Sequence, residues 1–255
     1  MCYTNSMSKV AIHYNDINYV RKWENLPSGK YNGAYYYSRD IEEHLAPLLT
    51  TKRPINVLGT VCCGGEQHMV VFIHNYLDPK AYGWLKRYND VIVVSSDYNV
   101  EDEILKDHKV IHLPLSVNVE EIAKHKVKKK TQEACYMGNP WVFKKQELAE
   151  LVPPEVHRFG EMGREELWDI VAKYKYAYAI GLCAIEARVL GCRLKMSRYR
   201  YPDPEGKFKV FDLKEAAVCL QEAIDIIEQG ETNYFDCTKL ASYKKFIKGH
   251  PENNV

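Results

Sequence analysis

The chain has 255 residues, of which 46% are hydrophobic and 27% charged, with 35 Lys and Arg against 34 Asp and Glu. This ordinary globular composition excludes a disordered or low-complexity chain, and the length fits one large domain or two compact ones. A net charge of +1 provides no global attraction to nucleic acid or to an anionic membrane, so a local patch would have to recognise either partner.

Strands and helices are expected to alternate along the first half of the chain. The predicted strands cover 9–14, 55–59, 69–73, 91–94 and 110–113, and the predicted helices cover 34–49, a segment starting at Pro79, and 100–106. Near-continuous apolar strands separated by helices are typical of a parallel sheet that is covered on both faces.

The same alternation follows a polar, basic stretch at 119–132, which we interpret as a linker or an exposed helix. Strands are predicted at 134–137, 155–159, 176–180 and 192–196, and helices at 144–151, 164–172, 183–190 and 213–228, before a short tail at 243–247. The α/β class is therefore expected, with domains at 1–118 and 133–230 and a C-terminal tail at 231–255.

The eight cysteines are spread along the chain, mostly among apolar residues, and only Cys62 and Cys63 are close in sequence. Structural zinc sites need clustered Cys and His ligands, whereas buried free thiols behave as small hydrophobes. We expect a reduced, cytoplasmic protein without a metal site. No apolar run approaches the roughly 18 residues of a membrane span, and the N-terminus lacks a signal-peptide pattern.

Glycines follow several predicted strands of the second half, notably Gly138, Gly163 and Gly181. Ligands of open α/β sheets bind beyond the carboxyl ends of the strands, where glycine allows close approach and lysines such as Lys144 and Lys145 can neutralise a diphosphate. The same glycines also suit plain turns, and the two lysines suit a solvated helix end. The spacing leaves both interpretations open.

The segment 181–192, Gly-Leu-Cys-Ala-Ile-Glu-Ala-Arg-Val-Leu-Gly-Cys, resembles the Gly-Leu-Pro-x-Leu-Glu-Ala-x-Ala-x-Gly-x-Pro segment of GT-B glycosyltransferases. Segments 91–96, 111–118 and 137–145 resemble other motifs of that family, in the same order along the chain. The resemblance implies two Rossmann-like βα domains that face each other. It also implies a nucleotide-sugar donor as substrate, no cofactor and no obligatory metal.

Residue by residue, the resemblance implies that Glu186 binds the ribose hydroxyls of the donor and that the amides of Gly181 and Leu182 face its diphosphate. The remaining donor-binding candidates are Gly138, Asn139, Lys144 and Lys145. The sequence departs from the family at Tyr178, where an earlier glutamate is usual, and at Asn139, where an arginine is usual.

On the acceptor side, His74 resembles a histidine that many members of the family place in the cleft. Asp16 and Asp78, each near the end of a predicted strand, compete with it as the general base. These three residues are the catalytic candidates.

The resemblance thus implies transfer of a sugar to an acceptor hydroxyl, with a large acceptor such as modified DNA as one option. Basic residues at 124–130, and arginines interleaved with tyrosines at 193–201, suit phosphate contacts and base stacking, although a linker and a strand edge would look the same. A non-catalytic protein that binds a nucleotide or phosphorylated ligand is the first alternative. A nucleic-acid-binding module is the second.

Overall fold

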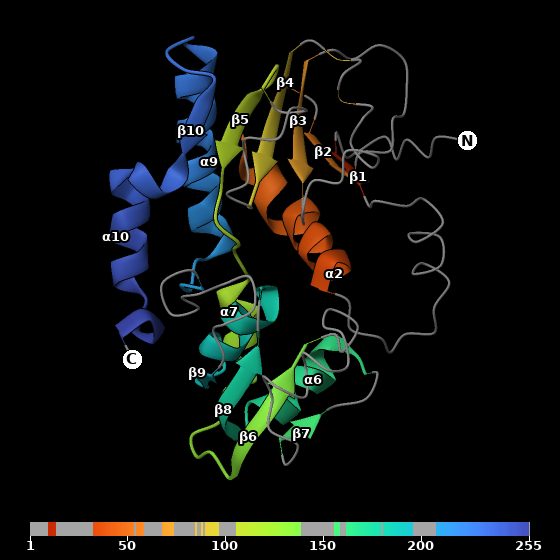
Figure 1. The fold of residues 1–255 in the computed structure, drawn as a ribbon, viewed down its shortest axis with the longest axis vertical. Helices are drawn as coiled ribbons and strands as arrows, with labels where there is room; N and C mark the ends of the chain where they lie inside the picture. The colour runs from red at the N-terminus through yellow and green to blue at the C-terminus, as the bar shows by residue number, and fades with distance from the viewer. Residues whose placement is uncertain are drawn as a thin grey trace, which may run out of the picture. The chain divides into compact units, whose positions relative to one another are not determined.

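The computed structural model describes residues 10–13, 33–53, 55–58, 68–73, 85, 88, 90–96, 106–138, 156–158, 162–179, 181–195 and 208–254. The chain divides into two compact units, each with its own parallel sheet (Figure 1). Unit 1 comprises 1–25, 37–114 and 213–245, and unit 2 comprises 26–36, 115–212 and 246–255. Each unit is therefore assembled from segments that are far apart in the sequence.

Among the described residues, the sheet of unit 1 contains six parallel strands in the order β1-β2-β3-β4-β5-β10. They are β1 (Val10–His13), β2 (Ile55–Leu58), β3 (His68–Ile73), β4 (Asp90–Ser95), β5 (Lys109–His112) and β10 (Tyr234–Asp236). The five strands predicted in the first half are confirmed, whereas β10 was not predicted. Because β1 to β5 follow one another across the sheet, their order differs from the reversed order of a doubly wound fold.

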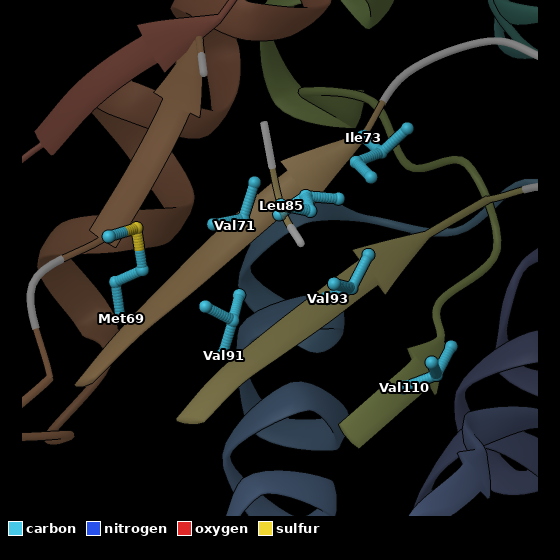
Figure 2. Close-up of a cluster of buried hydrophobic side chains, with 7 residues drawn as sticks. All are labelled: Met69, Val71, Ile73, Leu85, Val91, Val93 and Val110. Atoms are coloured by element: carbon cyan, nitrogen blue, oxygen red, sulfur yellow. The ribbon is translucent and has the colours of Figure 1, made fainter. Parts of the chain in front are cut away.

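The core of unit 1 lies on both faces of its central strands. One face carries the cluster in Figure 2, which consists of Met69, Val71, Ile73, Leu85, Val91, Val93 and Val110. The other face buries Val70, Ile92 and Ile111. Burial on both faces explains why these strands are apolar at every position instead of at alternate ones.

Helix α9 (Leu213–Glu228) belongs to unit 1, where it contacts β5 and β10. The predicted helix at 213–228 is confirmed, but it packs in unit 1 and not with the rest of the expected 133–230 domain. It also contacts the π-helical turn η1 (Ile41–Leu45), which extends α2 (Gly33–Asp40) and leads into the 3-10 turn η2 (Ala46–Leu48). Together, α2, η1 and η2 form the helical segment predicted at 34–49.

The described part of unit 2 contains four parallel strands in the order β7-β6-β8-β9. They are β6 (Gln132–Met137), β7 (His157–Arg158), β8 (Tyr174–Ala179) and β9 (Arg193–Lys195). After β7 the chain returns across β6 to form β8, so the strand order reverses beside β6 as in a doubly wound sheet. The predicted parallel α/β class is therefore confirmed.

In the described residues between 115 and 195, unit 2 has the helices α4 (Val119–Ala123), α6 (Arg164–Val171) and α7 (Leu182–Val189). The last two were predicted, and α4 forms the first part of the stretch interpreted as a linker or helix. Asn118 caps α4, because its Oδ1 accepts a hydrogen bond of 3.1 Å from the Glu121 amide. The helices predicted from Pro79 and at 144–151, and most of the one at 100–106, lie outside the described residues.

The C-terminal residues form β10, the 3-10 turn η5 (Cys237–Lys239), α10 (Ala241–Gly249) and a final turn, η6 (Pro251–Asn254). Asn253 anchors the last turn to unit 2, because its side-chain amide accepts from the Val210 amide at 2.6 Å and donates to the Val210 carbonyl at 2.9 Å. No helix in the described part of the chain combines the length and hydropathy that crossing a membrane requires.

Candidate functional site

The candidate site is the switch-point edge of unit 2, defined here by Gly138 and Gly181 at the carboxyl ends of β6 and β8. The last residues of these strands, Met137 and Ala179, are paired in register, so the two glycines follow neighbouring strand ends. Ligands of doubly wound sheets bind at this position, because the connections leave in opposite directions and open a crevice between them.

Gly181 adopts a backbone conformation that residues with a side chain avoid. It caps the start of α7 with φ of 59° and ψ of −138°. This is a left-handed region open essentially to glycine. No described atom lies within 4 Å of a Cβ built there. The Ala184 amide donates to the Gly181 carbonyl at 3.1 Å. The Leu182 amide at the first position of α7, together with the positive end of the helix dipole, favours an anion beside Gly181.

Gly138 lies against an aromatic ring at the same edge. A Cβ at this position would lie 3.1 Å from the hydroxyl oxygen of Tyr136, which is closer than an ordinary contact. Glycine therefore keeps the backbone after β6 close to the tyrosine.

Helix α7 is buried around its whole circumference, including two charged side chains, Glu186 and Arg188. It contacts all three longer strands of unit 2 as well as α4 and α6. Arg188 Nη1 donates to the carbonyl of Glu252 at 3.3 Å, which ties the helix to the C-terminal turn. This packing fixes the N-terminus of α7 at the edge of the sheet.

Glu186 is enclosed by protein, with 0% of its surface exposed. Its Oε1 accepts hydrogen bonds from Nε and Nη2 of Arg164, at 3.2 and 3.1 Å. The Arg164 guanidinium also lies over the rings of Trp168 and Tyr36, at 4.5 and 5.0 Å from their centroids. A ligand can therefore reach the Glu186 carboxylate only if the residues that cover it move.

The structure brings Gly138 and Gly181 to one edge of the sheet. Helix α7, which carries Leu182 and Glu186, begins directly after Gly181. The Leu182 side chain is buried, so its backbone amide is the part suited to meet a ligand. The other donor-binding candidates, Asn139, Lys144 and Lys145, lie outside the described residues, as do the catalytic candidates His74, Asp16 and Asp78.

Arg164 belongs to none of the motifs that single out site residues in the sequence. It occupies the first position of α6, where the helix dipole disfavours a cation. A cation at an unfavourable helix position is a signal of a tertiary partner, and here that partner is Glu186.

The basic stretch before β6 contains one lysine with a structural role. Lys130 Nζ donates to the carbonyls of Ala172 and Leu190, at 2.7 and 2.5 Å, and so caps the C-terminal ends of α6 and α7. Burial lowers the pKa of Lys130 and raises the pKa of the neighbouring Cys192 thiol. Lys128 and Lys129 are exposed, so they are better placed than Lys130 to meet an external anion.

No protein-family model, curated protein or solved structure gave a significant match to the chain. The geometry of unit 2 and the motifs in the sequence therefore carry the functional proposal.

Proposed function

We propose that the chain is a glycosyltransferase of GT-B architecture that binds a nucleotide sugar at the switch-point edge of unit 2. The sugar passes to an acceptor hydroxyl without an obligatory divalent metal. The observation that carries the proposal is the reversal of strand order beside β6, which brings Gly138 and Gly181 to adjoining strand ends.

In this proposal the donor diphosphate lies at the N-terminus of α7. The Gly181 conformation leaves room for a phosphate oxygen, and the Leu182 amide and the helix dipole stabilise the charge that develops as the diphosphate leaves. Because α7 is buried on all sides, the start of the helix need not reorganise during the reaction. Lys144 and Lys145 add positive charge, and His74, Asp16 or Asp78 supplies the general base.

A non-catalytic nucleotide-binding protein is the second candidate. Two observations favour it: the Glu186 carboxylate is enclosed and paired with Arg164, and Tyr178 occupies the position of the family's earlier glutamate. A protein that has exchanged ribose and sugar contacts for internal packing could still hold a diphosphate through the α7 N-terminus.

The first test compares Gly181→Ala with Gly230→Ala. Both glycines have positive φ, 59° and 80°, and neither has a described atom within 4 Å of an added Cβ. Each variant should lose about 1–3 kcal/mol of stability through backbone strain. Only Gly181→Ala should also weaken nucleotide-sugar binding, by at least about tenfold, because the methyl group fills space beside the helix end.

Thermal shift with a panel of nucleotide sugars measures binding, and release of nucleoside diphosphate in the presence of acceptor sugars measures transfer. Stabilisation with EDTA-insensitive release supports the transferase, whereas stabilisation without release supports the binding protein. Equal loss of affinity in both glycine variants would contradict a site at the switch-point edge.

A further inference from the structure

The two faces of the unit 2 sheet differ in chemistry. One face carries the buried side chains of alternate residues of β6 and β8, namely Cys135, Met137, Ala177 and Ala179. Helices α6 and α7 also contact β8. The opposite face carries Tyr136 from β6, Tyr174, Tyr176 and Tyr178 from β8, and Arg193 and Lys195 from β9.

The register places these tyrosines and cations in rows across the strands. Tyr136 pairs with Tyr178, which pairs with Lys195, and in the next row Tyr176 pairs with Arg193. Partners in a parallel ladder project from the same face, so each row runs from aromatic rings to a cation at the edge strand.

Exposure rises along the rows towards β9. Tyr136 is 3% exposed, Tyr176 and Tyr178 are half-buried, and Arg193 and Lys195 are exposed. Lys195 Nζ lies 4.2 Å from the centroid of the Tyr176 ring. The accessible part of the face thus combines two aromatic rings with two positive charges.

We propose that this tyrosine–cation face, formed by Tyr176, Tyr178, Arg193 and Lys195, binds single-stranded nucleic acid. Side chains two positions apart on a strand are separated by about 6.6 Å, so unstacked bases can each lie on one tyrosine ring once a base displaces the Lys195 ammonium from the Tyr176 ring. The two cations then meet the phosphates beside those bases. Duplex bases are already stacked on one another and cannot use the rings in this way.

The charge of the face favours a polyanion over a neutral glycan or an apolar peptide. None of the described residues on this side of β6, β8 and β9 is acidic. The carboxylate of Glu133 belongs to the opposite face, where it forms an ion pair of 2.8 Å with Lys175.

The inference goes beyond the proposed function and does not depend on it. Tyr178 and Lys195 are at or next to the carboxyl ends of their strands, the same edge of the sheet at which Gly138 and Gly181 follow β6 and β8. If both proposals hold, the bound strand is the acceptor of the transferred sugar.

The test measures fluorescence anisotropy of labelled oligo-dT and oligo-rU with the full chain over a range of salt concentrations. Tyr176→Ala and Tyr178→Ala should each weaken binding by about 5- to 150-fold, whereas Tyr176→Phe and Tyr178→Phe retain it. Arg193→Gln and Lys195→Gln should each reduce the slope of log affinity against log salt by about 0.7.

Lys175→Gln is the matched control. It removes an exposed cation from β8, the strand that carries Tyr176 and Tyr178, but from the opposite face of the sheet. It should change neither the affinity nor the salt slope. The proposal is overturned if no oligonucleotide binds at low salt, if Lys175→Gln matches Lys195→Gln, or if duplex or a neutral oligosaccharide binds equally well. If an alanine variant fails to fold, the salt slopes of Arg193→Gln and Lys195→Gln still test the proposal, because both side chains are exposed.

Thermal shift by nucleotide sugars, measured on the same variants, separates the two proposals. Unchanged donor binding in the tyrosine and cation variants would show that the strand-binding face and the donor site are independent. Donor binding without oligonucleotide binding would overturn this inference and leave the proposed function standing.

Discussion

Arg164 and Glu186 form a buried ion pair within unit 2. The Arg164 side chain is 7% exposed and the Glu186 side chain 0%, so both charges have left water. Removing two ions from water is unfavourable, and only their mutual attraction and hydrogen bonds offset this. The two rings beside Arg164 add favourable cation–π contacts.

Breaking the pair should therefore destabilise the protein strongly. Glu186→Ala leaves the Arg164 guanidinium buried without its carboxylate, and we expect the free energy of unfolding to fall by about 3–5 kcal/mol. Urea denaturation measures the change. The double variant Arg164→Met with Glu186→Leu should lose less than the sum of the single variants, because neither charge is stranded.

The exposed pair between Arg39 and Glu42 provides the comparison, with 45% and 21% of the side chains accessible. Arg39→Ala should change stability by no more than about 1 kcal/mol, because water screens exposed pairs. Similar effects at the two pairs would contradict the structural role of Arg164. Loss of nucleotide binding in Glu186→Ala would also need a folding control before it could indicate a ribose contact.

Among the elements, α9 shows how one helix completes the core of unit 1. Its apolar residues recur at helical spacing, and the buried ones are Leu213, Ala216, Ala217, Cys219, Leu220, Ala223, Ile224 and Ile227. Burial raises the pKa of the Cys219 thiol on this face to about 11, so the thiol stays protonated well above neutral pH. The helix therefore presents a continuous apolar surface to the sheet.

Two substitutions on α9 should have very different effects. Leu220→Ala removes a fully buried side chain and should lower the free energy of unfolding by about 2–5 kcal/mol. Val218→Ala, two residues earlier and 50% exposed, should stay within about 0.5 kcal/mol of the natural chain. Chemical denaturation of both variants checks this, and comparable losses would mean that α9 does not pack as described.

For the whole molecule, the interleaving of the two units predicts how the chain can be divided. Unit 1 takes α9 and β10 from 213–245, more than 90 residues after β5 in the sequence. A fragment covering 1–118 lacks both elements, so the edge of β5 is left unpaired and one face of the sheet loses its helix. We expect this fragment not to unfold cooperatively and to bind a hydrophobic dye.

Circular dichroism and dye fluorescence of the 1–118 fragment, with and without a peptide covering 213–245, provide the measurement. The peptide should restore a cooperative transition. A cooperative transition in the fragment alone would show instead that the domain boundaries expected from the sequence are sufficient for folding.

Much of the secondary structure could be predicted because its signals are local. The apolar run at 91–94 predicts β4, and the helical spacing in 213–228 predicts α9. Strand β10 could not be predicted, since its three residues have no distinctive period and become a strand only by pairing with β5. Gly181 was recognisable as a glycine after a strand, but the 22-residue separation of Arg164 and Glu186 hid their contact.

The sequence by itself determined the α/β class, the positions of most strands and helices, and the glycines at the strand ends of the second half. These follow from hydrophobic period and backbone preference, which act over a few residues. Only the tertiary structure decided the strand order, the enclosure of Glu186 by Arg164 and the assignment of α9 to unit 1. It also decided the alignment of Tyr178 with Lys195. Each of these depends on contacts between segments far apart in the chain, where loop closure and side-chain packing select one arrangement among many that share the same local signals.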